Sequence, residues 1–173
     1  MYLRPLEEKD AEGMLEWMHD PEIQKSFRAA MSDKTREEVL SFIQSAGTDP
    51  KNQRNIHYAI ADENDEYLGT ISLKDIDSSS KSAEYAISLR KCAQGKGIAA
   101  WATREILRIA FEELRLQRIF LNVLSDNEKA IHLYEKSGFV YEGAFRRHLF
   151  LRGEYKTLKW YSILDNEYFE KYF

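Results

Sequence analysis

Apolar side chains in the first fifty residues recur mostly at helical spacing. Residues 2–6 predict a short first strand, and a one-sided apolar stripe predicts a helix over about 10–19. Pro21 is expected to stop or redirect that helix. A second helix is predicted to begin near Thr35, because Thr35 and Glu38 match a capping box and an apolar face follows them.

The middle of the chain changes to a period of two, which is typical of strands. Apolar and polar residues alternate over about 55–62, and strand-like stretches follow at 67–73 and 83–89. The polar run 63–66 between the first two stretches is a turn signal. These three stretches therefore predict an antiparallel meander.

The second half of the chain predicts a helix, a strand, a second helix and two strands, over about 98–114, 118–123, 125–136, 139–145 and 155–164. Ser125 and Glu128 match a capping box for the second helix, and Gly138 stands where a glycine commonly ends one. Arg152-Gly153 predicts the turn between the last strands. A strand–helix–strand order implies at least one parallel pairing. We therefore expect an α+β fold, in which helices flank a central mixed β-sheet of about seven strands.

The composition is that of an ordinary globular protein, with 43% apolar and 31% charged residues. Residues 1–173 are expected to form one domain. The net charge of −4, with both signs spread along the chain, argues against nucleic-acid and membrane partners. Cys92 is the only cysteine and the histidines lack ligand spacing, so no disulfide or metal site is expected. The start of the chain lacks a signal-peptide pattern, which favours a cytoplasmic location.

A glycine-containing loop at residues 94–99 joins a predicted strand to a predicted helix, an arrangement that binds phosphates. The first turn of a helix offers unpaired N–H groups, and Gly95 and Gly97 carry no Cβ atom that would block an anion. The Walker A pattern is excluded because Gly97 follows Lys96, and the Rossmann pattern because position 100 is not glycine. The simpler alternative is a tight turn without a ligand.

Asn127 and Tyr134 lie seven residues apart in the last predicted helix, about two turns along one face. By spacing alone, Tyr134 is more simply explained as a core tyrosine and Asn127 as a helix cap.

Together these segments resemble the GNAT N-acetyltransferase superfamily. The acetyl-CoA loop of that family has Gln or Arg, two residues, Gly, one residue, then Gly or Ala, and Gln94, Gly97 and Ala99 match it in order. Residues 127–139 look like the family's second cofactor segment, and the predicted order of elements is also the family's. The resemblance is closest to the branch of ribosomal-protein N-terminal, spermidine and aminosugar acetyltransferases, which shares the opening at residues 4–6.

The resemblance implies direct transfer of an acetyl group from acetyl-CoA to a primary amine in one ternary complex. Tyr134 matches the family's general acid, since a phenol is protonated at neutral pH and can donate to a thiolate. Glu84 is the first candidate for the base, because it matches a position that is often acidic in this branch. A strand glutamate that faces solvent is the alternative.

The same resemblance implies which residues contact acetyl-CoA. The backbone of 87–89 can pair with the amides of the pantetheine arm and stabilise the oxyanion, while the glycine loop takes the pyrophosphate. The expected cofactor residues are Ile87, Ser88, Leu89, Gln94, Gly95, Lys96, Gly97, Ile98, Ala99, Asn127 and Tyr134.

In this branch the acceptor pocket is lined by the first two helices, the loop between them and the last hairpin. Here these regions supply Trp17, Glu22, Phe27, Arg28, Arg146, Arg147, His148 and Tyr155. The stretch 25–34 carries Lys25, Arg28 and Lys34 against Asp33, and this basic character suits an anionic acceptor such as an aminosugar nucleotide. A protein N-terminus also fits.

A polyamine acceptor would be expected to need carboxylates in the pocket. Thr157 stands where the branch often has an acidic residue, which weakens the polyamine alternative further. A non-catalytic acyl-CoA sensor domain is a further alternative, against which the presence of Tyr134 argues. A homodimer is compatible with the resemblance, although no sequence feature indicates one.

Overall fold

The computed structural model describes residues 1–49 and 54–173, and its centre is a mixed β-sheet in the order β1-β2-β3-β4-β5-β7-β6. The expected seven-stranded fold is confirmed. Neighbouring strands run antiparallel except β4 and β5, which are parallel. The strands are β1 (Tyr2–Pro5), β2 (Ile56–Ala61), β3 (Tyr67–Asp77), β4 (Ser82–Leu89), β5 (Arg118–Leu124), β6 (Val140–Leu151) and β7 (Glu154–Leu164).

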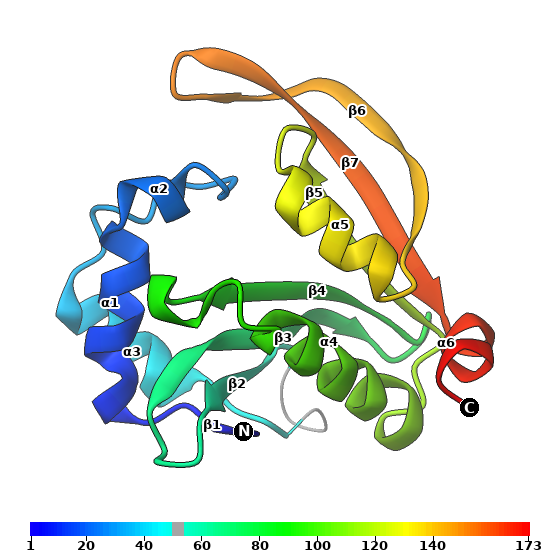
Figure 1. The fold of residues 1–173 in the computed structure, drawn as a ribbon, viewed down its shortest axis with the longest axis horizontal. Helices are drawn as coiled ribbons and strands as arrows, with labels where there is room; N and C mark the ends of the chain where they lie inside the picture. The colour runs from blue at the N-terminus through cyan, green and yellow to red at the C-terminus, as the bar shows by residue number, and fades with distance from the viewer. Residues whose placement is uncertain (50–53) are drawn as a thin grey trace.

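The helices cover the sheet on both faces (Figure 1). They are α1 (Ala11–His19), α2 (Pro21–Gln24), α3 (Arg36–Ser45), α4 (Ile98–Arg108), α5 (Glu128–Lys136) and α6 (Asp165–Tyr172), with the short turns η1 (Glu8–Asp10), η2 (Lys91–Ala93) and the π-helical η3 (Ile109–Glu113). None of the helices in the described part of the chain has the length and apolar character needed to cross a membrane.

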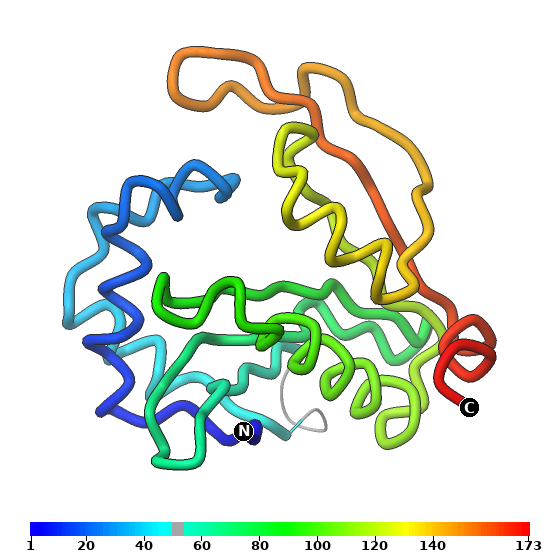
Figure 2. The backbone as a smooth tube through the Cα atoms, in the orientation of Figure 1, coloured from blue at the N-terminus to red at the C-terminus, as the bar shows by residue number. Residues whose placement is uncertain are grey.

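Two hydrophobic cores lie on the two faces of the sheet. Alternate residues of β2 enter them: Ile60 belongs to the core under α4 and α5, and Ala59 to the core under α1 and α3. The backbone trace shows the two helix groups at different ends of the sheet (Figure 2). Helices α1 and α3 pack against β2 and β3. The same face of the neighbouring strands β4 and β5 is therefore not covered by these two helices.

The predicted helix ends can be compared with the structure. Pro21 redirects the chain as predicted: α1 ends at His19 and Pro21 opens α2, because Asp20 caps α2 by accepting from the backbone N–H groups of Glu22 and Ile23. The predicted capping box at Thr35 is confirmed, since both of its hydrogen bonds form. The one predicted at Ser125 is wrong: the Asn127 side chain caps α5, accepting from the Ala130 N–H at 3.3 Å.

The parallel pair β4–β5 opens into a V. Only three residue pairs join the two strands, and the last of them is Glu84 with Phe120. Beyond this vertex, β4 continues to Leu89 and pairs only with β3, whereas β5 continues to Leu124 and pairs only with β7. In Figure 1, β4 runs toward α1 while β5 and α5 turn away from it. The diverging halves leave the facing backbone groups of β4 without a partner strand.

The β6–β7 hairpin extends over the open side of this V. Its predicted turn at Arg152-Gly153 is confirmed, and both residues adopt the left-handed conformation that tight hairpin turns need, with φ of 50° and 83°. The Arg152 guanidinium donates to the carbonyls of Gln24 and Lys25 at 3.1 and 3.0 Å. The hairpin tip is therefore tied to the end of α2.

Candidate active site

The glycine loop forms an exposed turn between β4 and α4. Gly95 and Gly97 have φ of 72° and 77°, and a Cβ atom added to either would meet no other atom within 4 Å. Gly97 is also the cap residue of α4 and supplies no capping side chain, so the first N–H groups of the helix stay available. Lys96 is exposed and has no ion-pair partner among the described residues. Open space, unpaired donors and positive charge suit a pyrophosphate.

The predicted contacts on β4 lie between this loop and the vertex of the V. Ile87, Ser88 and Leu89 are half-buried, and they pair with Ile71, Thr70 and Gly69 of β3. Gln94 reaches back to this strand, where its side-chain amide lies 3.5 Å from the Leu89 carbonyl. The open edge of β4 therefore leads directly from the glycine loop to Glu84.

Tyr134 connects the two diverging halves of the sheet. Its ring, on α5, meets the ring of Tyr85 on β4 edge to face at 5.7 Å. The side chain is 9% exposed, and its hydroxyl has no hydrogen-bond partner in the described part of the chain. Burial raises the pKa of Tyr134 to about 12, while the nearby charge of Arg28 acts in the opposite direction. The result is a protonated phenol with an unused donor at the opening between the strands.

Glu84 stands at the vertex and does not face open solvent, because its side chain is only 14% exposed. Its carboxylate receives a hydrogen bond from Arg28 Nη2 at 2.9 Å and lies 3.4 Å from Lys74 Nζ. Arg28 comes from the segment that follows α2, so this ion pair joins that segment to the vertex. Glu84 and Tyr134 are thereby both close to the same guanidinium.

The Asn127 side chain is used for capping α5 through its oxygen. The geometry is compatible with a contact from its amide nitrogen to the cofactor, but the cap alone accounts for an asparagine at this position. Its cofactor role stays a prediction, as do those of the other predicted site residues.

The predicted acceptor residues divide into two groups. Trp17 was expected to line the pocket and does not: it is 3% exposed, donates to the Tyr67 hydroxyl at 3.0 Å and stacks on Phe27. Lys25 and Lys34 pair with glutamates of their own segments, Glu22 and Glu38. Of the three predicted cations in this stretch, Arg28 is the one that pairs with Glu84 at the vertex.

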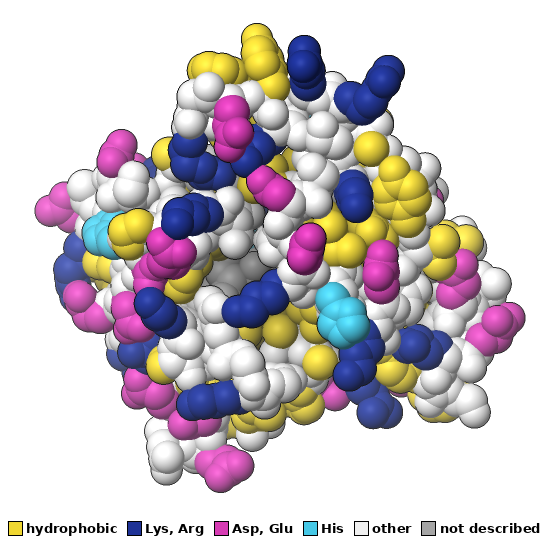
Figure 3. Space-filling view, turned by 45° about the horizontal axis from the view of Figure 1, so that its top comes forward, with side chains coloured by type: hydrophobic (Ala, Val, Ile, Leu, Met, Phe, Trp, Pro, Cys, Tyr) yellow, Lys and Arg dark blue, Asp and Glu magenta, His cyan; other side chains and the backbone are white. Residues whose placement is uncertain are grey.

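The hairpin contributes a second set of predicted acceptor residues, which are exposed: Arg146, Arg147, His148 and Tyr155. On the face between α2 and the hairpin, Lys and Arg side chains lie interspersed with Asp and Glu side chains (Figure 3). No cluster of three metal-ligating side chains occurs within residues 1–49 and 54–173.

The glycine loop yields the first prediction. Gly97→Ala should lower the affinity for acetyl-CoA about tenfold, because an L-residue resists φ of 77° by about 1–2 kcal/mol and its methyl group enters the anion's space. Titration calorimetry measures the affinity. Gly153→Ala is the matched control, since Gly153 has φ of 83° and equally open surroundings at the hairpin tip. Equal losses in both variants would contradict a cofactor role for Gly97.

Known proteins share this fold and sequence. A family model described as an acetyltransferase (GNAT) domain matches residues 1–140. A spermidine N(1)-acetyltransferase of Vibrio cholerae is 34% identical over 114 residues, or 66% of each chain. A putative ribosomal N-acetyltransferase of Bacillus subtilis is 37% identical over 100 residues, covering 58% of this chain and 55% of the relative. The aligned part of this chain thus spans less than two thirds of either relative's length.

A solved structure extends the likeness to nearly the whole chain. The crystal structure of spermidine N-acetyltransferase from Vibrio cholerae in complex with CoA and spermine superposes with a TM-score of 0.87 at 27% identity, and 97% of each chain is covered.

The fold and the sequence matches together define the class of protein, an acetyltransferase. The chain belongs to the GNAT acetyltransferase family. Membership of this family identifies the enzyme class as N-acetyltransferase and the co-substrate as acetyl-CoA, as the sequence resemblance implied.

Proposed function

We propose that this protein transfers the acetyl group of acetyl-CoA directly to a primary amine. The observation that carries the proposal is the opening between β4 and β5, which has at one side a protonated phenol without a hydrogen-bond partner among the described residues, and a carboxylate at its vertex. The whole chain, 1–173, acts as one domain, and its place of action is the cytoplasm. These last two points rest on the sequence.

The reaction assigns one task to each part of the site. The amine nitrogen attacks the thioester carbonyl, and backbone N–H groups of 87–89 stabilise the oxyanion. When the C–S bond breaks, the thiolate takes the phenolic proton of Tyr134. The proton lost by the amine passes to Glu84, directly or through water, and Tyr134 is reprotonated afterwards.

The pH dependence follows from the state of Tyr134. A general acid must be protonated, and its pKa of about 12 keeps the phenol protonated at any lower pH. We therefore expect kcat to rise with pH as the acceptor amine deprotonates, and to show no falling limb below about pH 10. A falling limb near neutral pH, measured at saturating substrates, would contradict the role of Tyr134 as acid.

The acceptor is proposed to be a small molecule with a primary amine. The basic surroundings of the opening favour an acceptor with negative charge, such as an aminosugar nucleotide, and a protein N-terminus is a related candidate. Spermidine or spermine is the second candidate, because relatives are named as spermidine N-acetyltransferases and one is bound to spermine. A homodimer is compatible with these acceptors.

Release of the CoA thiol tests the proposal. Purified protein should release thiol from acetyl-CoA only when an amine is added, and mass spectrometry should find the acetylated amine. Spermidine, aminosugar nucleotides and N-terminal peptides form the first panel. Tight acetyl-CoA binding without release from any amine would overturn the enzyme assignment and favour a sensor domain.

A further inference from the structure

We propose that Arg28 and Glu84 together recognise the acceptor, and that this acceptor carries an anionic group close to its amine. The inference rests on the proposed function and names its substrate class. Amino carboxylates and amino phosphates, including phosphorylated aminosugars, share this chemistry. In the pair, Glu84 receives the acceptor's ammonium group before deprotonation, and Arg28 receives the acceptor's acidic group.

The ion pair stands where the reacting amine has to arrive. Glu84 belongs to the last residue pair of β4 and β5 before the strands diverge. Arg28 Nη2 reaches it at 2.9 Å from a segment 56 residues away, and the charge of Arg28 also acts on Tyr134. The guanidinium is 40% exposed and the carboxylate 14%. Arg28 is thus the more accessible member of the pair.

Arg28 has capacity for a further partner. It makes one hydrogen bond within the described part of the chain, although a guanidinium carries five N–H donors. Its remaining donors form the planar fork that matches a carboxylate or phosphate in two-point contact. An incoming anion can therefore bind Arg28 without leaving any side chain unsatisfied.

A zwitterionic acceptor fits this pair because it can be inserted with every charge still matched. Its ammonium replaces the guanidinium at Glu84, and its anion compensates Arg28. A polyamine would replace Arg28 at Glu84 and place further ammonium groups close to Arg28 and Lys74, the two cations that pair with this carboxylate. Like charges at such separations repel, and this repulsion discriminates against the polyamine.

The other cations of the segment do not offer this recognition. Lys25 and Lys34 form exposed ion pairs with Glu22 and Glu38 at 2.7 and 2.8 Å, just after α2 and just before α3. Lys25 is therefore a matched control for Arg28, because it lies three residues away and its replacement by glutamine removes the same charge.

Acceptors that differ only in charge test the inference. Glucosamine and glucosamine 6-phosphate form one pair, 3-aminopropanol and β-alanine a second, and spermidine is the cationic reference. The wild-type protein should show kcat/KM about tenfold or more higher for the anionic member of at least one pair, as expected for one charge-assisted contact. The pair that responds tells a phosphate acceptor from a carboxylate acceptor.

Variants of Arg28 locate the effect. Arg28→Gln should abolish the preference by raising KM for the anionic acceptor, and Arg28→Glu should move it toward spermidine. Lys25→Gln should keep the wild-type order. Calorimetry with acetyl-CoA verifies that each variant is folded and binds its co-substrate.

Two results would overturn the inference while the proposed function stands: spermidine preferred by the wild-type protein, or an Arg28→Gln variant that slows all acceptors equally. Absence of amine-dependent thiol release with every acceptor would overturn the proposed function, and the inference with it.

Discussion

Replacing Tyr134 with phenylalanine should lower kcat by roughly a hundredfold or more, the range expected when a general acid is removed. The thiolate must then leave without the proton that Tyr134 supplies. Acetyl-CoA affinity should change little, because the ring keeps its contacts with the rings of Tyr85 and Phe139, whose centroids lie 5.7 and 5.9 Å from its own. Steady-state kinetics of thiol release and calorimetry measure the two effects separately.

Tyr168→Phe is the matched control for this prediction. Tyr168 is also a buried tyrosine. Its hydroxyl donates to Glu112 Oε1 at 2.6 Å, and neither residue belongs to the proposed reacting groups. This variant should lose some stability and keep its kcat. A Tyr134→Phe variant with wild-type kcat, or equal losses in both variants, would show that Tyr134 is a core residue only.

The second large effect concerns stability. Asp10→Ala should lower the free energy of unfolding by about 3 kcal/mol, because it leaves the Arg4 guanidinium buried with part of its hydrogen bonds unmade. Arg4 and Asp10 are 8% and 1% exposed, and two hydrogen bonds of 2.8 and 2.9 Å join them. Asp10 also accepts from the Glu7 N–H. Urea unfolding measures the change.

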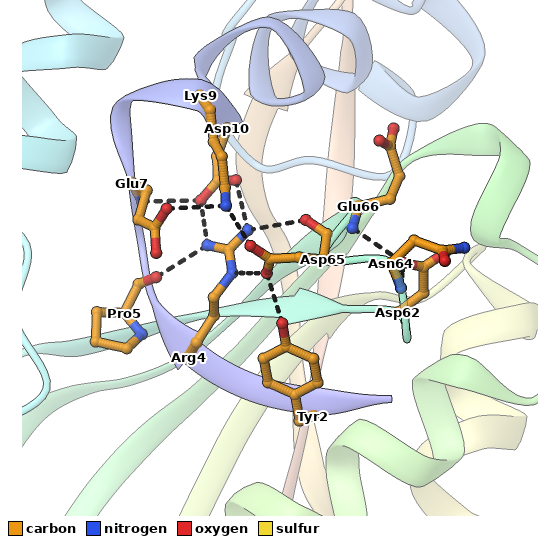
Figure 4. A network of polar contacts seen from close by, with 10 residues as sticks. All are labelled: Tyr2, Arg4, Pro5, Glu7, Lys9, Asp10, Asp62, Asn64, Asp65 and Glu66. Carbon is orange, nitrogen blue, oxygen red and sulfur yellow. Dashed lines mark hydrogen bonds and ion pairs between the residues drawn. The ribbon is translucent and has the colours of Figure 1, made fainter.

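Figure 4 shows why this residue matters to the fold around it. Arg4 connects β1 to Asp10 and also donates to Asp65 in the turn between β2 and β3. Lys9 and Tyr2 bind the same Asp65 carboxylate, and Lys9, Tyr2 and Arg4 hold the pKa of Asp65 well below its usual range. The network fixes the first strand against the sheet and the start of α1.

The exposed pair Lys25–Glu22 provides the comparison for stability. Glu22→Ala should change the free energy of unfolding by about 0.5 kcal/mol or less, since exposed ion pairs contribute little. A loss as small as this in Asp10→Ala would contradict the structural role of the Arg4 network.

Most of the fold could be predicted because its elements follow simple periods. The alternation of Ile56, Tyr58 and Ile60 and the capping box at Thr35 each correspond to an observed strand or helix. The short helix α2 was not predicted, since four residues carry too little periodicity and the capping role of Asp20 depends on Pro21 after it. Helix α6 was missed because Tyr168 is the one buried residue among its eight, so no apolar period marks it.

The helix predicted over 98–114 has the right extent and an unexpected geometry. Its last turn is π-helical, with the Leu114 N–H bonded to the Ile109 carbonyl at 2.9 Å. The wider turn lets three consecutive residues, Ile109, Ala110 and Phe111, be buried together. A uniform helical period cannot represent such a run.

The candidate site divides in the same way. The glycine loop and Tyr134 could be proposed from the sequence because each matches a family segment that is local in the chain, although spacing alone favoured a core tyrosine at position 134. The ion pair between Arg28 and Glu84 depends on two segments that only the folded chain brings together, and no spacing rule relates them. The Arg4 network is similar, although the opening at residues 4–6 was a recognisable feature of the sequence.

A crystal structure of the protein with CoA tests the central claim most directly. The pyrophosphate should lie at residues 95–99, the pantetheine arm should run along the open edge of β4 at 87–89, and the sulfur should lie within hydrogen-bond reach of the Tyr134 hydroxyl. CoA bound elsewhere, or a sulfur remote from Tyr134, would contradict the assignment of this opening as the active site.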